Sequence, residues 1–310
     1  MGEKIISWLF DGDVSIQYQV NQDLLNTEQL ALRRRIAIEG WGEQFLSYRN
    51  MNGTWGRGFY QPKWTSTHYT LIDLQDLRID PHNEPITETI DLILRDHREN
   101  DGGVNPGKTI KDSDVCINGM FLNYACYFKV PVMSLKSIVD FLISLQMGDG
   151  GFNCRLNRGV AVHSSLHSTI SVLEGLHEYI MNGYRYRLSE LTEIVEEAQE
   201  FILQHKLFRS DRTNEVIDKR MLMFSYPSRW RYDVLRSLDY FQSTDIEYDE
   251  RMQDALDVLV KKRRKDGTWP VQAKHPGQTH FDMEQIGRPS RWNTLRALRV
   301  LKKYYPDGFP

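Results

Sequence analysis

The polar residues with the most informative spacing are Asp114-Val-Cys116 and His167. A carboxylate, a thiolate and an imidazole are all zinc ligands, and three protein ligands with one open position are typical of catalytic zinc. Residues two apart on a helix point about 200° apart, so Asp114 reaches Cys116 only as the N-cap of a helix that begins at Val115. The same residues also suit structural roles: a helix cap, a small buried cysteine and a buried histidine. The sequence predicts a zinc site here, with this structural interpretation as the alternative.

Two further histidines extend this group. His163 lies four residues before His167, a spacing that places two ligands on one helical face, although no Glu follows His163 as in a metalloprotease helix. We interpret His163 as a residue of the preceding loop that is able to supply an extra ligand or a proton. His68 either completes a cluster with Asp114, Cys116 and His167 or is an exposed histidine at the end of a loop.

A second set of candidates surrounds a long segment without helical periodicity, residues 208–230. Its arginines are expected to bind the anionic part of a substrate, such as a diphosphate, because guanidinium forks suit phosphate and carboxylate. The alternative is that they are solvated loop charges. The predicted substrate-binding residues are Arg209, Arg212, Arg229 and Arg231, together with His68, Tyr232 and Trp292.

Recurring helices must position these residues. Apolar residues at intervals of three and four predict helices over 134–147, 188–205 and 248–264, with Ser134 and Ser189 as N-caps. Gly-rich turns close several of these helices, and each turn is followed by a second, inner kind of helix. Aligned on their apolar residues, the inner helices begin near His68, Cys116, His167, Tyr232 and Trp292. Since a helix N-terminus carries unpaired N–H groups and a positive dipole end, this is where an anion, thiolate or metal-bound ligand is expected.

The turn Gln146-Met-Gly-Asp-Gly-Gly-Phe152 resembles the repeat of the terpenoid cyclases and protein prenyltransferases. Weaker copies are Gly53-Thr-Trp55 and Gly267-Thr-Trp269, which lack the Gln, and Gly102-Gly103-Val104, which also lacks the aromatic residue. The resemblance implies an all-α chain without strands, folded as one α/α-toroid domain over residues 1–310 with an inner and an outer ring of helices. An open α-solenoid is the alternative.

The same resemblance extends to the candidate site. Asp114-Val-Cys116 and His167 resemble the zinc ligands of prenyltransferase β-subunits, in which a zinc-bound thiolate attacks a prenyl diphosphate. Here the spacing is shorter, and no basic diphosphate motif is present. Asp112-Ser-Asp114-Val115 resembles the Asp-x-Asp-Asp acid of squalene–hopene-type cyclases, with Val115 in place of the last Asp. Asp112, Asp114 and His163 are therefore the catalytic candidates, and zinc is the candidate cofactor.

Composition narrows the function further. A net charge of −3 argues against nucleic acid as the main partner. Three cysteines are too few for a disulfide framework, and neither a signal peptide nor a membrane-spanning run is found, so a cytoplasmic protein is expected. We expect an enzyme of prenyltransferase or cyclase type that acts on an isoprenoid or similar apolar ligand. The alternatives are a non-catalytic scaffold that binds a peptide or protein and a metal-dependent hydrolase.

Overall fold

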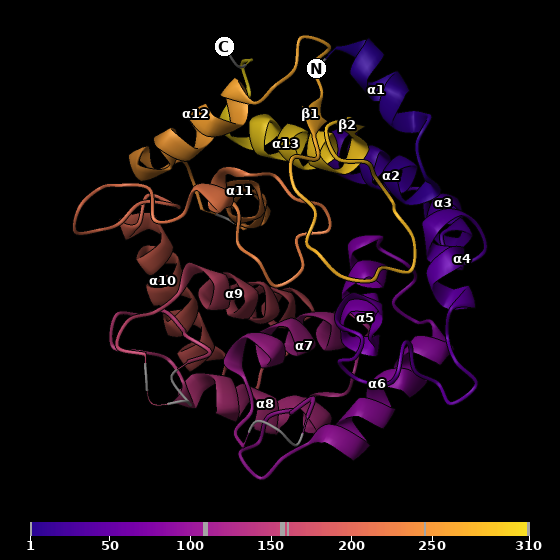
Figure 1. The fold of residues 1–310 in the computed structure, drawn as a ribbon, viewed down its shortest axis with the longest axis vertical. Coiled ribbons are helices and arrows are strands. Elements are labelled where there is room, and N and C mark those ends of the chain that lie inside the picture. The colour runs from indigo at the N-terminus through magenta and orange to yellow at the C-terminus, as the bar shows by residue number, and fades with distance from the viewer. Residues whose placement is uncertain (1, 108–110, 156–158, 160, 245, 309–310) are drawn as a thin grey trace. The chain divides into compact units, whose positions relative to one another are not determined.

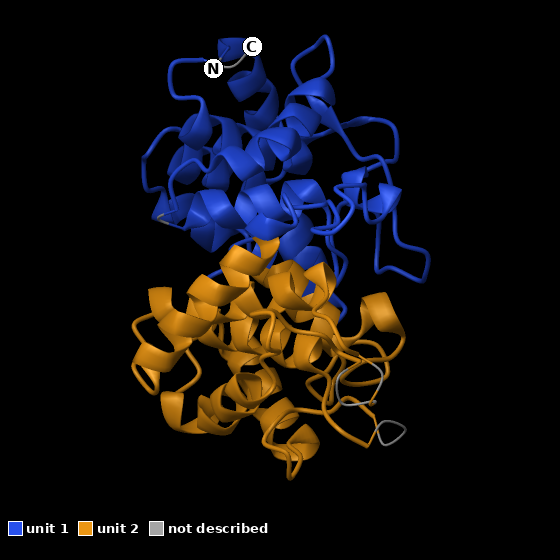
Figure 2. Cartoon of the chain, turned by 90° about the vertical axis from the view of Figure 1, so that its left-hand side faces the viewer, with its two compact units in different colours: residues 1–48, 76–80, 203–310 blue, residues 49–75, 81–202 orange. Residues whose placement is uncertain are grey.

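The computed structural model describes residues 2–107, 111–155, 159, 161–244 and 246–308. Contacts between residues divide the chain into two compact units, which are coloured separately in Figure 2. Unit 1 comprises residues 1–48, 76–80 and 203–310, and unit 2 comprises residues 49–75 and 81–202. The single domain expected over residues 1–310 stays a prediction, and each unit is described here by itself.

Unit 2 alternates two kinds of helix (Figure 1). In one kind almost every side chain is buried, and in α7 and α9, which pack along each other, even polar residues are enclosed. Their backbones approach closely, since a Cβ on Gly175 would lie 2.3 Å from the Gly119 carbonyl oxygen. These buried helices are α5 (Thr67–Asp76), α7 (Val115–Tyr127) and α9 (Leu166–Met181).

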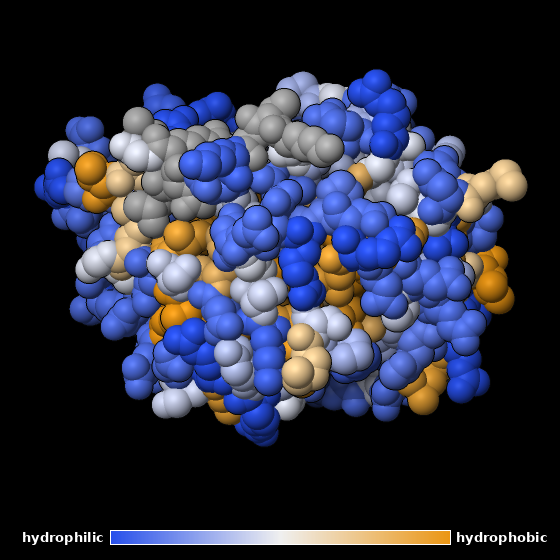
Figure 3. Space-filling model, turned by 90° about the horizontal axis from the view of Figure 1, so that it is seen from below, coloured by the Kyte–Doolittle hydropathy of each residue, from blue (hydrophilic) through white to orange (hydrophobic). Residues whose placement is uncertain are grey.

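The second kind of helix in unit 2 is amphipathic. In α6, for example, Ile86, Ile90 and Ile93 are buried while the charged residues of the helix face outward. Figure 3 views the molecule from below Figure 1, where α6 and α8 lie, and hydrophilic residues cover most of that face. The amphipathic helices are α6 (Glu84–His97), α8 (Val132–Ser144) and α10 (Leu188–Gln204).

The Gly-Gly turns of unit 2 have two distinct requirements. Gly150 has a φ of +86°, a left-handed conformation that favours glycine. Gly151 is required for space, because a Cβ there would lie 2.6 Å from the Ser164 Cβ. Asp149 accepts hydrogen bonds from the backbone and hydroxyl of Ser164, and so connects the turn to the start of α9. Asp101, Gly102, Gly103 and Ser113 repeat this arrangement before α7.

A side chain of the following helix holds the residue after each turn. The Thr169 hydroxyl accepts from the backbone N–H of Phe152, and the Asn118 amide oxygen accepts from that of Val104. Thr169 and Asn118 are each the fourth residue of their helix. A buried Val104 is therefore equivalent to the aromatic residue, although its type differs.

The residue four positions before the positive-φ glycine contacts a neighbouring helix in the three copies of unit 2. The Gln146 amide donates to Gly150 O at 3.1 Å and to Glu197 of α10. Arg98 donates to Ser134 O of α8, and Arg49 donates to Thr89 of α6. Arginine thus replaces the glutamine in the copies that lack it, which the sequence comparison missed.

Unit 1 contains its own buried helix pair, α11 and α13, which pack against each other. Arg296 of α13 pairs with Asp239 of α11 at 3.0 Å, and Arg299 pairs with Asp23 at 2.6 Å, so ionic contacts connect its elements. Residues 20–24 form a π-helical turn, and 219–222 and 250–252 form 3₁₀ turns. The helices and strands are α1 (Glu3–Phe10), α2 (Val14–Gln19), α3 (Leu30–Arg35), α4 (Gly40–Ser47), α11 (Val234–Ser243), α12 (Gln253–Lys261), β1 (Trp269–Pro270), β2 (Pro289–Ser290) and α13 (Arg291–Tyr304).

The all-α prediction is confirmed, with one small difference. β1 and β2 form an antiparallel pair of two residues each. Strands this short leave no recognisable pattern in the sequence. The predicted caps are wrong: α8 begins after Pro131, which leaves Ser134 inside the helix, and Ser189 is the second residue of α10. Among the described residues, no helix is both long enough and apolar enough to cross a membrane.

Candidate functional site

The inner-helix alignment is confirmed at four of its five positions. His68, Cys116, His167 and Trp292 are each the second residue of α5, α7, α9 and α13. Tyr232 is the exception and is corrected here. Helix α11 begins at Val234, after an Asp233 N-cap, so Tyr232 precedes it and donates its buried hydroxyl to Leu207 O.

The centre of the candidate site in unit 2 is the imidazole of His68. This side chain is fully buried, and the rings of Phe59, Tyr60, Tyr69 and Tyr124 lie with their centroids 5.0 to 5.6 Å from it. Its Nδ1 lies 3.3 Å from the Tyr124 hydroxyl, whereas its Nε2 is buried without a hydrogen-bond partner among the described residues. We call these five residues the His68 cage.

Burial controls the charge state of the His68 cage. Loss of water, with a smaller contribution from the nearby Lys63, lowers the pKa of His68 to about 3, so the imidazole is neutral near pH 7. Burial also raises the pKa of Tyr60 to about 12. The negative charge of Asp114 raises it as well, whereas the hydrogen bond between Tyr60 and Tyr69 acts in the opposite direction. The cage therefore combines an uncharged imidazole with protonated phenols.

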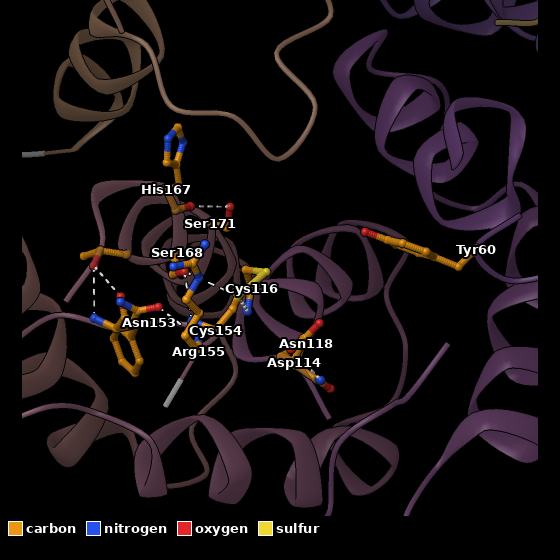
Figure 4. Close-up of a disulfide and its surroundings, with 12 residues drawn as sticks. Tyr60, Asp114, Cys116, Asn118, Asn153, Cys154, Arg155, His167, Ser168 and Ser171 are labelled. Carbon is orange, nitrogen blue, oxygen red and sulfur yellow. Dashed lines mark hydrogen bonds between the residues drawn. A yellow bond between two sulfur atoms is a disulfide. The ribbon is translucent and has the colours of Figure 1, made fainter. Parts of the chain in front are cut away.

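Asp114 lies at the edge of this cage, at the N-cap position of α7. Its carbonyl oxygen accepts from the Asn118 backbone, but its carboxylate does not cap the helix. Figure 4 shows the Tyr60 hydroxyl end directed toward the start of α7, in agreement with the electrostatic effect of Asp114 on Tyr60. Asp112 lies in the preceding loop and is separated from Asp114 by the buried Ser113.

The predicted zinc ligands do not come together as expected. Cys116 forms a disulfide with Cys154, although the cysteine count suggested free thiols, and the His167 ring points away from this bond (Figure 4). In the part of the chain that the structure describes, no three His, Cys, Asp or Glu side chains form a group able to hold a metal ion. Asp114, Cys116 and His167 therefore do not fit the metal in this oxidised form.

His163 is exposed in the loop before α9, as the sequence suggested. Helix α9 begins only at Leu166, so the four-residue spacing does not place His163 and His167 on one helical face. The His163 carbonyl oxygen accepts a hydrogen bond from the Asn153 side chain at 2.8 Å, and this contact belongs to the loop itself.

The four predicted arginines have different environments in unit 1. Arg209 pairs with Asp254 at 2.6 Å and donates to Asn214 O, so it holds its own loop together. Arg212 is exposed, and Arg229 is buried with a left-handed φ of +60°. Arg231 is half-buried over the Trp230 ring, 4.8 Å from its centroid, and its buried Nε has no hydrogen-bond partner in the described part of the chain.

No protein-family model matches the sequence, and no curated protein is similar to it. Among solved structures, the type II terpene cyclase MstE from Scytonema, in complex with its substrate geranylgeranyl dihydroxybenzoate, matches with a TM-score of 0.44 and 13% identity. The match covers 95% of this chain and 88% of that chain. The structure is similar to that of a terpene cyclase. This similarity concerns the fold alone.

Trp292, one of the predicted substrate-binding residues, belongs to an aromatic stack in unit 1. Trp292 lies between Trp41 and Tyr226, with centroid distances of 6.3 and 4.9 Å, and its Nε1 is buried without a partner in the described structure. Glu284 accepts hydrogen bonds from Ser290 and from the backbone N–H of Trp292. Burial raises the pKa of Glu284 to about 7. Glu284 lies in a loop without periodicity, so the sequence contained no signal for it.

Proposed function

We propose that this chain is an enzyme that converts an isoprenoid or a similarly apolar substrate through a carbocation, with the His68 cage as its reaction centre. One observation supports this most directly. A neutral imidazole is enclosed by four aromatic rings, and its Nε2 has no partner among the described residues. An unsatisfied buried polar atom costs about 1–3 kcal/mol, so this arrangement calls for an explanation.

The acid–base state of His68 suits carbocation chemistry. When Nδ1–H donates to the Tyr124 oxygen, Nε2 presents a lone pair. A carbocation is so strong an acid that a weak base is sufficient to remove a proton from the carbon beside it, and an alkene then forms. A neutral base also does not repel the cation, as an imidazolium would.

The aromatic rings of the cage provide the second part of the proposal. Ring faces attract cations, by about 0.5–2 kcal/mol for each ring, and they do so without a nucleophilic atom that would capture a carbocation. Of the four rings, that of Tyr60 is the least enclosed, and it lies in the loop before α5. We therefore infer that substrate reaches His68 by displacing Tyr60.

Asp114 is the proposed partner at the entrance. Its charge already acts on the Tyr60 hydroxyl, and its carboxylate is not used as a helix cap. In the proposed reaction Asp114 orients Tyr60 or delivers the proton that starts the reaction. The motif resemblance assigned this role to Asp112 and Asp114 together, and the buried Ser113 between them favours Asp114 alone.

The test is turnover of linear polyprenyl compounds, with and without a diphosphate, followed by mass spectrometry of the products. We expect His68→Ala to lower turnover about 10²–10⁴-fold, the usual contribution of general acid–base catalysis, and Asp114→Asn to lower it less. His82→Ala, the same change at an exposed loop histidine, is the matched control. Thermal melting must show that each variant is folded.

Two outcomes would contradict this proposal. Product formation by folded His68→Ala at the rate of His82→Ala would remove the base. Wild-type protein that neither binds nor converts any polyprenyl compound, but binds a peptide or protein, would support the scaffold function instead. Release of a hydrolysis product that depends on added metal would favour the hydrolase.

Binding of an anionic substrate group is a separate part of the proposal. Arg231 is the most suitable of the predicted arginines, because its Nε has no hydrogen-bond partner among the described residues. Arg231 and Arg229 also both lower the pKa of His275 through their positive charges, so positive charge is concentrated here. We expect Arg231→Ala to weaken binding of inorganic diphosphate about tenfold by calorimetry. Arg220→Ala removes an exposed arginine that pairs with Asp218 and should leave binding unchanged.

Zinc stays a prediction, and no step of the proposed reaction passes through a metal. Metal analysis of reduced protein purified without chelator tests it directly. Stoichiometric zinc that is lost in both Cys116→Ala and His167→Ala would support the ligand set expected from the sequence.

A further inference from the structure

The disulfide of unit 2 connects two segments that are distant in the chain. Cys116 lies in the first turn of α7, and Cys154 follows the Gly-rich turn that leads to α9. Their Cα atoms are 6.0 Å apart and the two residues are separated by 38 positions. Both residues are half-buried, so a small solute is able to approach the bond. The bond ties the segment before α9 to the start of α7.

Ser168 holds Cys154 in place from α9. The Ser168 hydroxyl donates to the Cys154 Sγ at 3.3 Å and accepts from the Cys154 backbone N–H at 3.1 Å. The backbone N–H of Cys116 also donates to the same sulfur at 3.3 Å. Cys154 therefore stays beside Cys116 through contacts that do not depend on the disulfide itself (Figure 4).

The third cysteine provides a contrast within the same unit. Cys126 is completely buried, is not part of a disulfide, and its thiol has a pKa raised by burial. Reactive cysteines are partly exposed and lie close to groups that stabilise negative charge, whereas buried ones are inert. By this criterion Cys116 and Cys154 are chemically accessible and Cys126 is not.

We propose that Cys116 and Cys154 form a redox-active pair that exchanges with low-molecular-weight thiols. This inference does not depend on the proposed function. A thiolate attacks the Cys116 sulfur, the S–S bond breaks, and its electron pair leaves on the Cys154 sulfur, toward which Cys116 N–H and Ser168 O–H point. A second thiolate then attacks the external sulfur of the mixed disulfide and releases Cys116. In total, two thiols are oxidised to one disulfide and the protein disulfide is reduced to two thiols.

Thiol–disulfide exchange would change how Cys154 is attached to the start of α7. In the oxidised form the segment that follows Phe152 is covalently attached to α7, two residues from Asp114. In the reduced form the hydrogen bonds from Ser168 and Cys116 to the Cys154 sulfur remain, and the Asn153 side chain still donates to His163 O. The pair is therefore able to switch Cys154 between a covalent and a hydrogen-bonded attachment to the start of α7, according to the thiol–disulfide balance of its surroundings.

The first test is a redox titration of the whole protein. Purified protein is equilibrated in glutathione buffers of increasing reduced-to-oxidised ratio, acid-quenched, labelled with a maleimide and analysed by intact and peptide mass. We expect Cys116 and Cys154 to become labelled together in one step within the range of glutathione buffers. Native protein labelled without quenching should leave Cys126 unmodified.

Two results would overturn this inference. Cys116 and Cys154 that are fully labelled even in oxidised glutathione do not form the bond. A bond that resists excess reduced glutathione in folded protein is structural and does not exchange.

A second test addresses the role of Ser168. Ser168→Ala removes both hydrogen bonds to Cys154 and should shift the glutathione ratio at half-reduction by about fivefold. Ser171→Ala is the matched control, because Ser171 is a buried serine one turn further along α9 whose hydroxyl donates to the His167 carbonyl oxygen. Equal shifts in the two variants, or no shift in either, would show that Ser168 does not position the sulfur.

Discussion

Two helices of this protein begin alike, but the chemistry around their second residues differs. His68 of α5 in unit 2 is enclosed by four aromatic rings, and the charge that acts on its imidazole is that of Lys63. Trp292 of α13 in unit 1 is also stacked between aromatic rings, but Glu284 accepts from its backbone N–H. Each residue has one buried ring nitrogen without a partner among the described residues.

The difference comes from the loops that precede the two helices. The loop before α5 contributes Phe59 and Tyr60, so it supplies aromatic rings, and its charged residue near His68 is the cation Lys63. The longer loop between β1 and β2 contributes Glu284, which places a carboxyl group at the N-terminus of α13. The repeat therefore fixes where a functional residue lies, and the loop determines its acid–base surroundings.

The largest expected effect is the loss of the Trp292 ring. Trp292→Ala should lower the free energy of unfolding by about 3–5 kcal/mol, because it leaves a cavity between Trp41 and Tyr226. Trp8→Ala, at a half-buried tryptophan of α1, is the comparison and should cost clearly less. Urea unfolding measures both. Equal losses would mean that the stack is not a special feature of α13.

The next effect is the acid sensitivity of the His68 cage. The pKa of His68 in the folded protein is about 3, below the usual 6.5, so the unfolded chain takes up its proton first as the pH falls. Stability from this group is complete above pH 6.5 and is lost toward pH 3, by on the order of 3 kcal/mol. His68→Gln should flatten this part of the pH–stability curve. A curve identical to that of the wild type would contradict the low pKa.

Glu284 should give an effect of opposite sign and smaller size. Its pKa in the folded protein is raised from 4.5 to about 7, so the unfolded chain releases its proton first as the pH rises. Stability should therefore fall between pH 4.5 and 7, by about 2 kcal/mol relative to Glu284→Gln. Chemical unfolding of the two proteins over this range tests the sign. A difference that grows as the pH falls would show that Glu284 is charged and held as a helix cap.

The smallest effect concerns a hydrogen bond that occurs once within each unit. Thr169 accepts from Phe152 N–H in unit 2, and Thr294 accepts from Trp269 N–H in unit 1. Thr169→Val and Thr294→Val should each cost about 1 kcal/mol, since each leaves a buried N–H without its acceptor. Thermal unfolding should give similar losses. A loss in only one variant would show that the repeat is not equivalent in the two units.

Periodicity predicted the helices well where packing follows a simple amphipathic pattern. The helix expected over 188–205 is observed as Leu188–Gln204, and the 3₁₀ turn Lys219–Leu222 is the helical element of the long irregular segment 208–230. The predicted caps failed because a serine near a helix start is common, and Pro131 determines where α8 begins. The predicted helix start at Tyr232 was wrong because the apolar residues of α11 also fit a helix that begins two residues earlier than Val234.

The candidate site was predicted only in part. The position of His68, Cys116, His167 and Trp292 at helix starts followed from their spacing. Their partners did not, because Tyr124 and Cys154 are brought to these residues by packing between segments far apart in the chain. Ligand types in a sequence therefore suggested zinc, whereas the side-chain directions of Cys116 and His167 do not support a shared metal.

By itself the sequence determined the all-α class, the recurring Gly-rich turns and the register of most buried helices, because these depend on local periodicity and on backbone angles that few residues adopt. Only the tertiary structure decided that His68 is neutral, that Cys116 faces Cys154 and that Glu284 accepts from the Trp292 backbone N–H. Charge state and bond partner depend on burial and on neighbours supplied by other segments. These are properties of three-dimensional packing, and no local pattern in the chain contains them.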